Sequence, residues 1–174
     1  MNTLDFLHRV LPSDGYYCGG LLSPRTGQKD YFSQKFFTSL EDLKDFLSIV
    51  SDKGYNSYYA ISSFTESGSR KRPNVKRTKL FALDLDVGKE NNSYATQRDA
   101  LAAFKDFMER AGLPKPMVVS SGKGFHIYWV LTRELEYTEW FPIAEGLKAT
   151  YLAHGLIVDP TVPSDCTQIL RAPD

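Results

Sequence analysis

The sequence contains few of the residues that build zinc sites and no run that could span a membrane. Only two of its 174 residues are cysteines, Cys18 and Cys166, which form no CxxC pair, and only three are histidines. A structural zinc site needs four closely spaced ligands of these types, so no zinc is expected. The chain has no uninterrupted apolar stretch of about 18 residues and no basic leader followed by an apolar run. We therefore expect a cytoplasmic protein without membrane association.

The chain also lacks net charge, because 21 Lys and Arg residues balance 21 Asp and Glu residues. A nucleic acid would have to be attracted by a local cluster of cations instead of an overall field. One such cluster lies between residues 70 and 79, and its candidate DNA-binding residues are Arg70, Arg72, Lys76 and Arg77. A template backbone can follow such a patch, but a solvated basic hairpin accounts for the pattern at least as well.

Length and composition fit one globular domain. A chain of this length with 42% hydrophobic and 13% aromatic residues can bury one core. We interpret residues 1–174 as a single bilobed domain, with an N-terminal α/β lobe over residues 1–79 and a second module over residues 80–174. In the lobe, Ser39 and Asp42 predict the N-cap of a helix. Its apolar face is expected to carry Leu40, Leu43, Leu47 and Val50.

The second module alternates predicted strands and helices. Period-two patterning and turn residues predict strands over 79–87, 116–121, 125–131 and 168–172. Helices are predicted from about residue 96 to Gly112 and from about residue 138 to Gly155. Their expected buried faces carry Leu101, Phe104, Met108 and Ala111 in the first helix, and Ile143, Leu147 and Tyr151 in the second. The order strand, helix, strand, strand, helix, strand predicts an α+β, RRM-like (ferredoxin-like) module.

Both helices of such a module cover one face of the sheet and leave the other face for ligands. Asp84 and Asp86 alternate with apolar neighbours, and His126 is in the same phase on the next long strand. We therefore expect all three side chains on the uncovered face. Two carboxylates at i and i+2 lie ~6.5–7 Å apart at their backbones, so both can reach hard divalent cations such as Mg²⁺ or Mn²⁺. A lone DxD strand with solvated acids is the plainer alternative.

The turn over residues 120–126 combines hydroxyls, glycines, a cation and an imidazole. Glycines permit close approach of the backbone to an anion, Lys123 supplies positive charge and His126 can donate a hydrogen bond. An ordinary hairpin turn explains the same residues more often when it stands alone. Further along, Asp159 is a candidate third acid and Arg171 a candidate triphosphate ligand. A Pro-rich loop with an Asx turn at Asp159 is an equally good interpretation of that segment alone.

Three segments, FALDLD, SSGKGFHIYW and VDPTVPSDCTQILRAP, resemble in this order the motifs of the archaeo-eukaryotic primase (AEP) superfamily. They cover about a fifth of the chain, and short primase-polymerases of phages and plasmids are the nearest likeness. The resemblance implies an RRM-like catalytic module and nucleotidyl transfer during DNA replication. It also implies nucleoside triphosphates, a single-stranded DNA template, a primer and a helicase domain or partner as ligands and partners, in the host cytoplasm.

Residue by residue, the resemblance implies a two-metal site of Mg²⁺ or Mn²⁺ held by Asp84, Asp86 and Asp159, with Asp165 as a weaker contender for the third position. His126 is implied to be catalytic and to bind the nucleotide. The other implied nucleotide ligands are Ser120, Ser121, Lys123 and Arg171. Superfamily members continue past the final basic-x-Pro motif, whereas this sequence ends at Asp174.

Three other kinds of protein remain as alternatives. A HAD-type phosphatase also begins with an apolar strand and DxD, but its motif has Thr or Val where this chain has Gly88. A glycosyltransferase with a DxD motif would leave the glycine turn unexplained. A non-catalytic RRM-like module that binds single strands would favour aromatic residues on the exposed face instead of acids.

Overall fold

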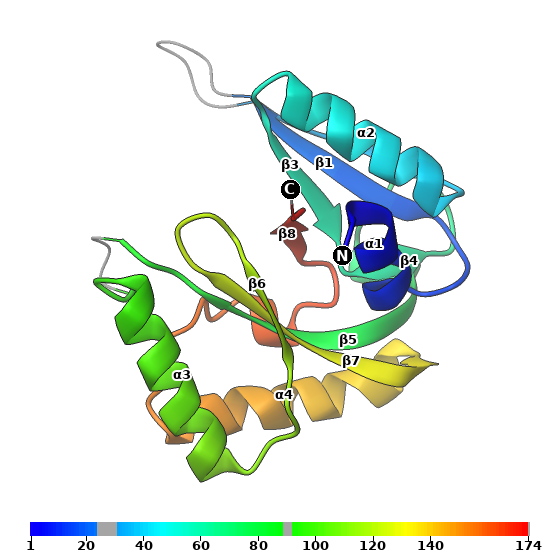
Figure 1. The fold of residues 1–174 in the computed structure, drawn as a ribbon. Helices are drawn as coiled ribbons and strands as arrows, with labels where there is room; N and C mark the ends of the chain where they lie inside the picture. Colours follow the sequence, from blue (N-terminus) through cyan, green and yellow to red (C-terminus); the bar gives the residue numbers. More distant parts are fainter. Residues whose placement is uncertain (24–30, 89–91, 174) are drawn as a thin grey trace. The chain divides into compact units, whose positions relative to one another are not determined.

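The computed structural model describes residues 1–23, 31–88 and 92–173. Within them the chain has an α+β fold of helices and two four-stranded sheets (Figure 1). The helices are α1 (Thr3–Val10), α2 (Leu40–Asp52), α3 (Gln97–Ala111) and α4 (Tyr137–Ala153), with short 3-10 helices η1 (Arg72–Asn74) and η2 (Val162–Ser164). The strands are β1 (Tyr17–Ser23), β2 (Tyr31–Phe37), β3 (Asn56–Ala60), β4 (Ser62–Phe64), β5 (Val75–Leu85), β6 (Met117–Ser120), β7 (Phe125–Leu135) and β8 (Ile169–Arg171).

The chain forms two compact units. The first comprises described residues within 1–79, together with 133–137 and those from Cys166 onward. The second comprises described residues within 80–132 and 138–165. The division that we expected at residue 79 coincides with one boundary between the units. Residues from Cys166 onward, which we had placed in the second module, group with the first unit.

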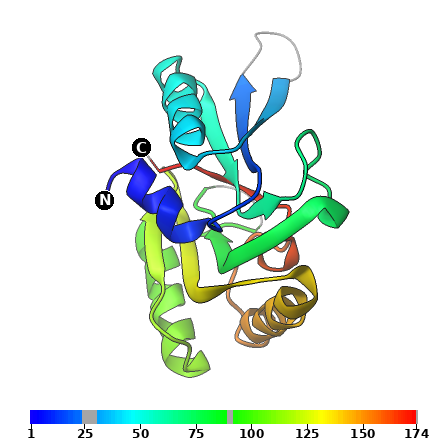
Figure 2. The same ribbon diagram turned by 90° about the vertical axis from the view of Figure 1, so that its right-hand side faces the viewer.

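The first unit is built on a sheet with the strand order β2-β1-β3-β8. Helix α2 packs on β1 and β3 and contacts α1, and Figure 2 shows it beside these strands. Ser39 caps α2, because its side chain accepts a hydrogen bond from the Asp42 N–H, as predicted. The predicted apolar face is confirmed, and its buried residues are Leu40, Leu43, Leu47 and Val50. This helix therefore covers part of the sheet with its apolar face.

The other sheet has the strand order β4-β5-β7-β6. Helices α3 and α4 pack on one face of it (Figure 1). That core includes Leu83, Leu85, Phe104, Phe107, Phe125, Ile127 and Tyr151. The predicted ends of α3 are confirmed: Thr96 caps its start, and Gly112 ends it in the left-handed region at φ 63°.

The buried faces of α3 and α4 are rotated relative to our expectation. Leu101 and Ile143, both expected in the core, are 41% and 52% exposed. Phe104 and Tyr151 are buried as expected, and Met108, Ala111 and Leu147 are partly buried against the core. The other buried residues are Ala100 and Phe107 in α3, and Trp140 and Ala144 in α4. Trp140 explains the second rotation, because its indole N–H donates to the Leu80 carbonyl at 2.8 Å and a large aromatic ring dominates the packing.

The last strand is not where a ferredoxin-like sheet places it. In such a sheet the fourth strand lies beside the first, but β8 pairs with β3 in the first unit's sheet. The place beside β5 is taken by β4. Ser62 of β4 shares a 2.7 Å hydroxyl contact with Thr78 of β5 and donates to the Cys166 carbonyl. These buried bonds favour β4 at that edge, so the module keeps the predicted order of elements with a substituted edge strand.

Candidate active site

Asp84 and Asp86 lie on the face of β5 opposite to α3 and α4. Leu83 and Leu85 point into the core under the helices, and period-two alternation puts the two acids on the other face, as predicted. The Asp84 side chain is 19% exposed, whereas Asp86 at the end of the strand is exposed. The two carboxylates therefore differ in solvent access, with Asp86 at the open end.

His126 stands beside Asp84, and it is buried. Its Nε2 atom is 3.7 Å from Asp84 Oδ1, and its Nδ1 atom is 3.1 Å from the hydroxyl of Tyr128. Our expectation of an uncovered face is wrong at His126, which is 3% exposed, and its partner Tyr128 is 0% exposed. Their mutual hydrogen bond satisfies polar groups that burial would otherwise penalise. The imidazole is thereby held by a neighbouring phenol, with its other nitrogen near a carboxylate.

The glycine turn between β6 and β7 lies directly against the acid-bearing strand. The turn is closed by the Ser121 N–H, which donates to the Gly124 carbonyl at 3.0 Å. A Cβ atom added to Gly124 would lie 2.1 Å from the Leu85 carbonyl oxygen and 3.2 Å from Asp86 Cα. No side chain fits in that space, so glycine is required for this close approach.

The start of α3 fixes the turn from its other side. Gln97 Nε2 lies 3.2 Å from both the Gly122 and the Lys123 carbonyl oxygens and donates to them. Ser120 and Lys123 are exposed, and Ser121 is partly buried. The turn therefore has a fixed backbone beside Asp86 and presents a cation and a hydroxyl to solvent.

Asp159 is joined to the acid-bearing strand through its backbone. Its N–H donates to the Asp84 carbonyl at 2.9 Å, and its neighbour Val158 is buried in the core. The Asp159 carboxylate also makes the Asx turn that we considered, because Oδ1 accepts from the N–H and the hydroxyl of Thr161 at 2.9 and 2.7 Å. The backbones of Asp84 and Asp159 thus meet, while one oxygen of the third acid is bonded within its own loop.

Tyr94 was not singled out from the sequence, yet it links these segments. Its N–H donates to the Asp86 carbonyl and its carbonyl accepts from the Gly88 N–H, both at 2.9 Å. Its hydroxyl accepts from the Ile157 N–H at 2.9 Å, two residues before Asp159. Burial raises the pKa of Tyr94, and the Ile157 hydrogen bond opposes that shift. An aromatic residue after a DxD strand carries no pattern that would have identified this role.

Tyr151 lies in the core below the third acid. Its pKa is raised, first by burial and then by the negative charges of Asp159 and Glu145. The phenol therefore stays neutral at physiological pH. A neutral hydroxyl near Asp159 adds no negative charge to a region that already contains carboxylates.

Arg171 and Asp165 are placed in different units. Arg171 lies on β8 opposite Tyr58, in the first unit. Asp165 follows η2 and belongs to the second unit. The acids, the glycine turn and His126 are likewise in the second unit, so Arg171 is the one predicted metal or nucleotide ligand that lies outside it.

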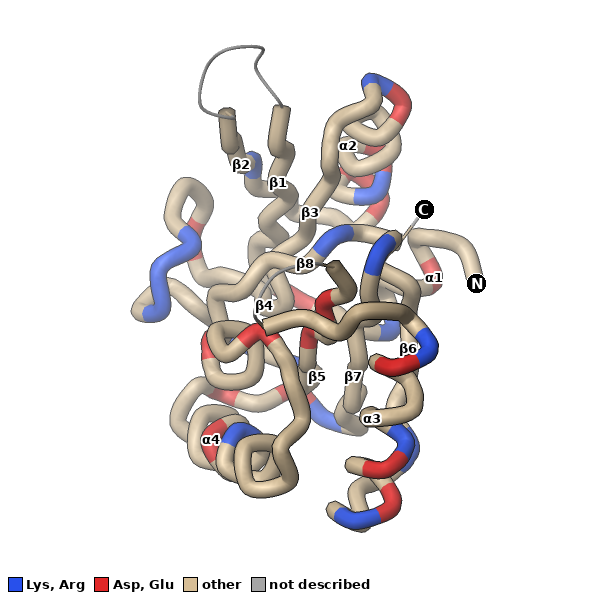
Figure 3. Tube along the Cα trace, turned by 90° about the vertical axis from the view of Figure 1, so that its left-hand side faces the viewer, with Lys and Arg blue, Asp and Glu red and all other residues tan. Residues whose placement is uncertain are grey.

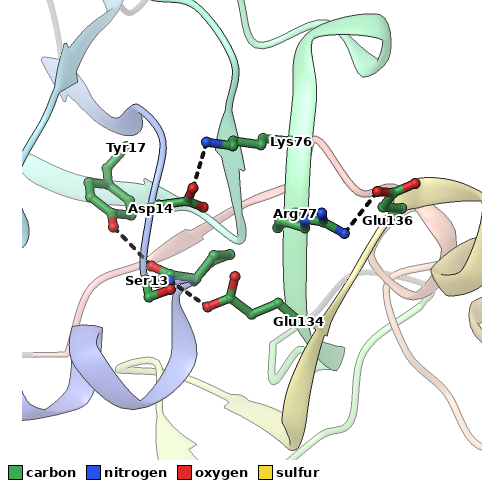
Figure 4. A network of polar contacts seen from close by, with 8 residues as sticks. Ser13, Asp14, Tyr17, Lys76, Arg77, Glu134 and Glu136 are labelled. Atoms are coloured by element: carbon green, nitrogen blue, oxygen red, sulfur yellow. Dashed lines mark hydrogen bonds and ion pairs between the residues drawn. The ribbon is translucent and has the colours of Figure 1, made fainter.

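The predicted DNA-binding residues all make contacts within the first unit. Lys76 Nζ lies 2.6 Å from Asp14 Oδ2, and Arg77 Nη1 lies 3.0 Å from Glu136 Oε1 (Figure 4). In the same network, the Tyr17 hydroxyl donates to the Pro12 carbonyl, and its pKa is raised by burial and by nearby acids. The charges of Lys76 and Arg77 are therefore largely neutralised by adjacent carboxylates.

Arg70 and Arg72 bind neutral groups instead. Arg70 donates from Nε to Gln34 Oε1 at 3.3 Å and from Nη1 to the Thr167 carbonyl. Arg72 donates to the Tyr137 hydroxyl at 3.1 Å and places its guanidinium carbon 5.3 Å from the centre of that ring. None of these contacts involves a carboxylate.

The donor set of the candidate site suits a hard cation. Among residues 1–23, 31–88 and 92–173, no three His, Cys, Asp or Glu side chains already stand together as metal ligands. Asp84 and Asp86 share one face, and the Asp159 backbone is bonded to Asp84. Carboxylate oxygens are the ligands that Mg²⁺ and Mn²⁺ prefer. The residues therefore fit a divalent ion, and the three-acid site stays a prediction.

No helix in the described part of the chain is both long and apolar enough to cross a membrane. In comparisons with known proteins, neither a family model nor a curated protein sequence matches this chain.

Several solved structures resemble the chain over nearly its whole length. The AEP domain of cyanophage S-2L primase-polymerase is 20% identical, with a TM-score of 0.66 over 98% of this chain and 79% of that one. The catalytic domain of primase RepB′ in complex with initiator DNA is 16% identical, with a TM-score of 0.56 over 99% and 76%. The polymerase domain of Mycobacterium tuberculosis ligase D in complex with DNA is 15% identical, with a TM-score of 0.54 over 98% and 73%. At these identities the likeness concerns the fold, and the chain has the fold of archaeo-eukaryotic-type primase domains.

Proposed function

We propose that the chain is a DNA-directed nucleotidyltransferase, a primase or primase-polymerase that acts in replication. It would join nucleotides on a single-stranded DNA template and release pyrophosphate. The fold supports this proposal, because the similar structures are primase and polymerase domains, two of them in complexes with DNA.

One observation carries the proposal. Three segments that are far apart in the sequence meet at the end of β5. The Asp159 N–H is bonded to the Asp84 carbonyl, and Gly124 packs against Leu85 and Asp86. A DxD strand alone would explain only a cation site. An acid-bearing strand with a phosphate-type turn on one side and a third acid on the other suits the binding of a metal-bound triphosphate.

Asp84, Asp86 and Asp159 would hold the divalent ions. When bound, two such ions lower the pKa of an attacking 3′-hydroxyl and stabilise the charge on the leaving pyrophosphate. The 3′-oxygen forms a bond to the α-phosphorus of the nucleotide, and the bond from that phosphorus to the bridging oxygen of the pyrophosphate breaks. The hydroxyl proton leaves to solvent. The chain contributes positioning and charge neutralisation, without a covalent intermediate.

The glycine turn would bind the triphosphate. Its backbone is fixed by Gln97 and by the packing of Gly124, so the exposed cation of Lys123 and the hydroxyls of Ser120 and Ser121 are presented by a preformed loop. His126 would donate a hydrogen bond to a phosphate oxygen while Tyr128 holds its other nitrogen. Arg171 is a further proposed ligand of the triphosphate.

The test compares primer extension and de novo priming by the wild type with Asp84→Asn/Asp86→Asn, with Mg²⁺ or Mn²⁺ and both kinds of nucleoside triphosphate. The matched control is Glu109→Gln/Glu145→Gln, which removes two exposed acids from α3 and α4. We expect the first variant to lose at least about 100-fold in rate, since charge stabilisation at a reacting centre is worth that much. The control should retain the wild-type rate.

Other outcomes would identify the alternatives. Equal extension by wild type and Asp84→Asn/Asp86→Asn would refute the assignment of the metal ligands. Release of inorganic phosphate from phosphate esters without a polymer product would indicate a HAD-type phosphatase. Strand binding that is indifferent to metal and nucleotide, with no extension, would indicate a non-catalytic RRM-like module.

A further inference from the structure

In the basic cluster of residues 70–79, a run of cations with no carboxylate partner among the described residues lies at the start of the segment. Three consecutive cations, residues 70–72, lie on the loop between β4 and β5, and Figure 3 shows this continuous basic stretch. Arg70 and Arg72 contact neutral groups, and in the described part of the chain the Lys71 ammonium has no hydrogen-bond or ion-pair partner. Lys76 and Arg77 are paired with acids. The loop therefore presents three uncompensated charges, in contrast to the strand that follows it.

The side chain of Asn74 holds this loop in shape. Its Nδ2 atom donates to the carbonyls of Glu66 and Ser69 at 2.8 and 2.6 Å. Its Oδ1 atom accepts from the Glu66 N–H at 3.0 Å, and its own carbonyl accepts from the Thr65 N–H. A loop fixed in this way loses little conformational freedom when it binds a ligand. The backbone that carries the three cations is therefore held in place.

An open pocket of about 330 Å³, lined by glycine and by residues with polar or charged groups, lies against the loop in the first unit. Its lining consists of Gln34, Gly68, Ser69, Arg70, Lys71 and Thr167. The lining offers two cations, hydroxyl groups and an amide, and contains no acidic residue. Arg70 uses two of its five N–H donors on Gln34 and Thr167, so further donors remain for a ligand. This composition suits the oxygens of a phosphodiester better than a base or an apolar group.

We infer that this pocket binds backbone phosphates of single-stranded DNA, with Lys71 and Arg70 as the principal cations and Ser69 as a hydroxyl donor. The inference rests on the proposed function for the identity of the polyanion. It shifts the expected DNA contact from Lys76 and Arg77 to residues 69–71. Contacts of this kind carry no base specificity and act through release of counterions from the strand.

The experiment measures binding of a short fluorescent oligothymidylate by anisotropy, without divalent metal or nucleotide, between about 50 and 200 mM NaCl. One phosphate contact contributes about 0.7 to the slope of log affinity against log salt, which is about fivefold in affinity at 0.1 M salt. Lys71→Gln should lower the slope by that amount and raise Kd about fivefold. Lys105→Gln, on the exposed face of α3, is the matched control and should leave both unchanged.

Arg70→Gln should have at least as large an effect, but it also removes contacts to Gln34 and Thr167 and can unfold the loop. Lys71 makes no such contact, so the inference is judged on Lys71→Gln, with unchanged thermal unfolding as the check on its fold. An unchanged salt slope in Lys71→Gln, or an equal change in Lys105→Gln, would overturn the inference even if the enzyme extends primers. A reduced slope in a protein without nucleotidyl transfer would support the pocket and refute the proposed function.

Discussion

The replacement Gly124→Ala tests the closest contact in the candidate site. The added methyl group would lie 2.1 Å from the Leu85 carbonyl oxygen, whereas an ordinary van der Waals contact lies at 3.4–4 Å. The turn or β5 must therefore separate by more than about 1 Å to accept it, because backbone atoms cannot rotate away as a flexible side chain does. Overpacking of this kind costs about 1–3 kcal/mol of unfolding free energy.

The same displacement would move the glycine turn away from Asp86. Misplacement by about 1 Å in a positioned site costs about 100-fold in rate, so primer extension by Gly124→Ala should fall by about that factor. Gly146→Ala is the matched control. Gly146 lies in α4, and a methyl group added there would have nothing within 4 Å of it, so alanine should raise the unfolding free energy by about 0.5–1 kcal/mol.

Two measurements decide the outcome. Denaturant unfolding reports the stability of both variants, and primer extension at saturating nucleotide reports the rate. Gly124→Ala should lower the unfolding free energy and Gly146→Ala should raise it. This difference in sign separates the steric effect at Gly124 from a general effect of replacing glycine by alanine. If Gly124→Ala unfolds and extends primers like the wild type, the turn does not lie against β5 as described, and the proposed triphosphate site loses its basis.

Two further predictions concern single side chains. Tyr94→Phe removes the acceptor for the Ile157 N–H. It should lower the unfolding free energy by about 1 kcal/mol and raise the Mn²⁺ concentration needed for half-maximal primer extension. Unchanged metal dependence would show that Tyr94 does not position Asp159. Burial raises the pKa of the Cys18 thiol to about 11, although Arg70 opposes the shift. The folded state holds the thiol proton more tightly than the unfolded state, whose pKa is about 9. The contribution of this thiol to the unfolding free energy is therefore fully present below about pH 9 and is lost as pH rises towards 11. Unfolding curves from pH 8 to pH 10.5 should fall more steeply for wild type than for Cys18→Ala, and parallel curves would contradict this.

The parts of the fold that the sequence predicted are those set by neighbouring residues. Ser39 and Thr96 cap their helices, and Gly112 ends α3 in the left-handed region, because each of these features depends on a few adjacent residues. Asp84 and Asp86 lie on the face opposite to the helices because period two is a property of any strand. Local chemistry was sufficient in each case.

The faces of α3 and α4 and the place of β8 depend on partners far away in the sequence. A helix of mixed apolar residues such as α4 admits more than one stripe, and the Trp140 bond to the Leu80 carbonyl decides between them. Strand β8 has only three residues, and its length and pattern do not specify a sheet. It could pair with the edge of either sheet, and the alternation of residues within one strand does not indicate which edge it joins.

The candidate site also combines features that the sequence predicts with features that depend on distant partners. The acids, His126 and the glycine turn of the candidate site were predicted from the sequence because their chemistry is visible in it. What the sequence did not contain is how they are held: Tyr94 bonded to Ile157, Gln97 bonded to the turn, and Tyr128 bonded to His126. These supporting residues are uncharged and have no motif of their own. Nucleotidyl transfer depends on placing a triphosphate against a hydroxyl. We therefore expect substitutions of Tyr94, Gln97 or Tyr128 to reduce the rate of primer extension although they remove no proposed ligand. Such a loss would distinguish an assembled site from a set of matching motifs.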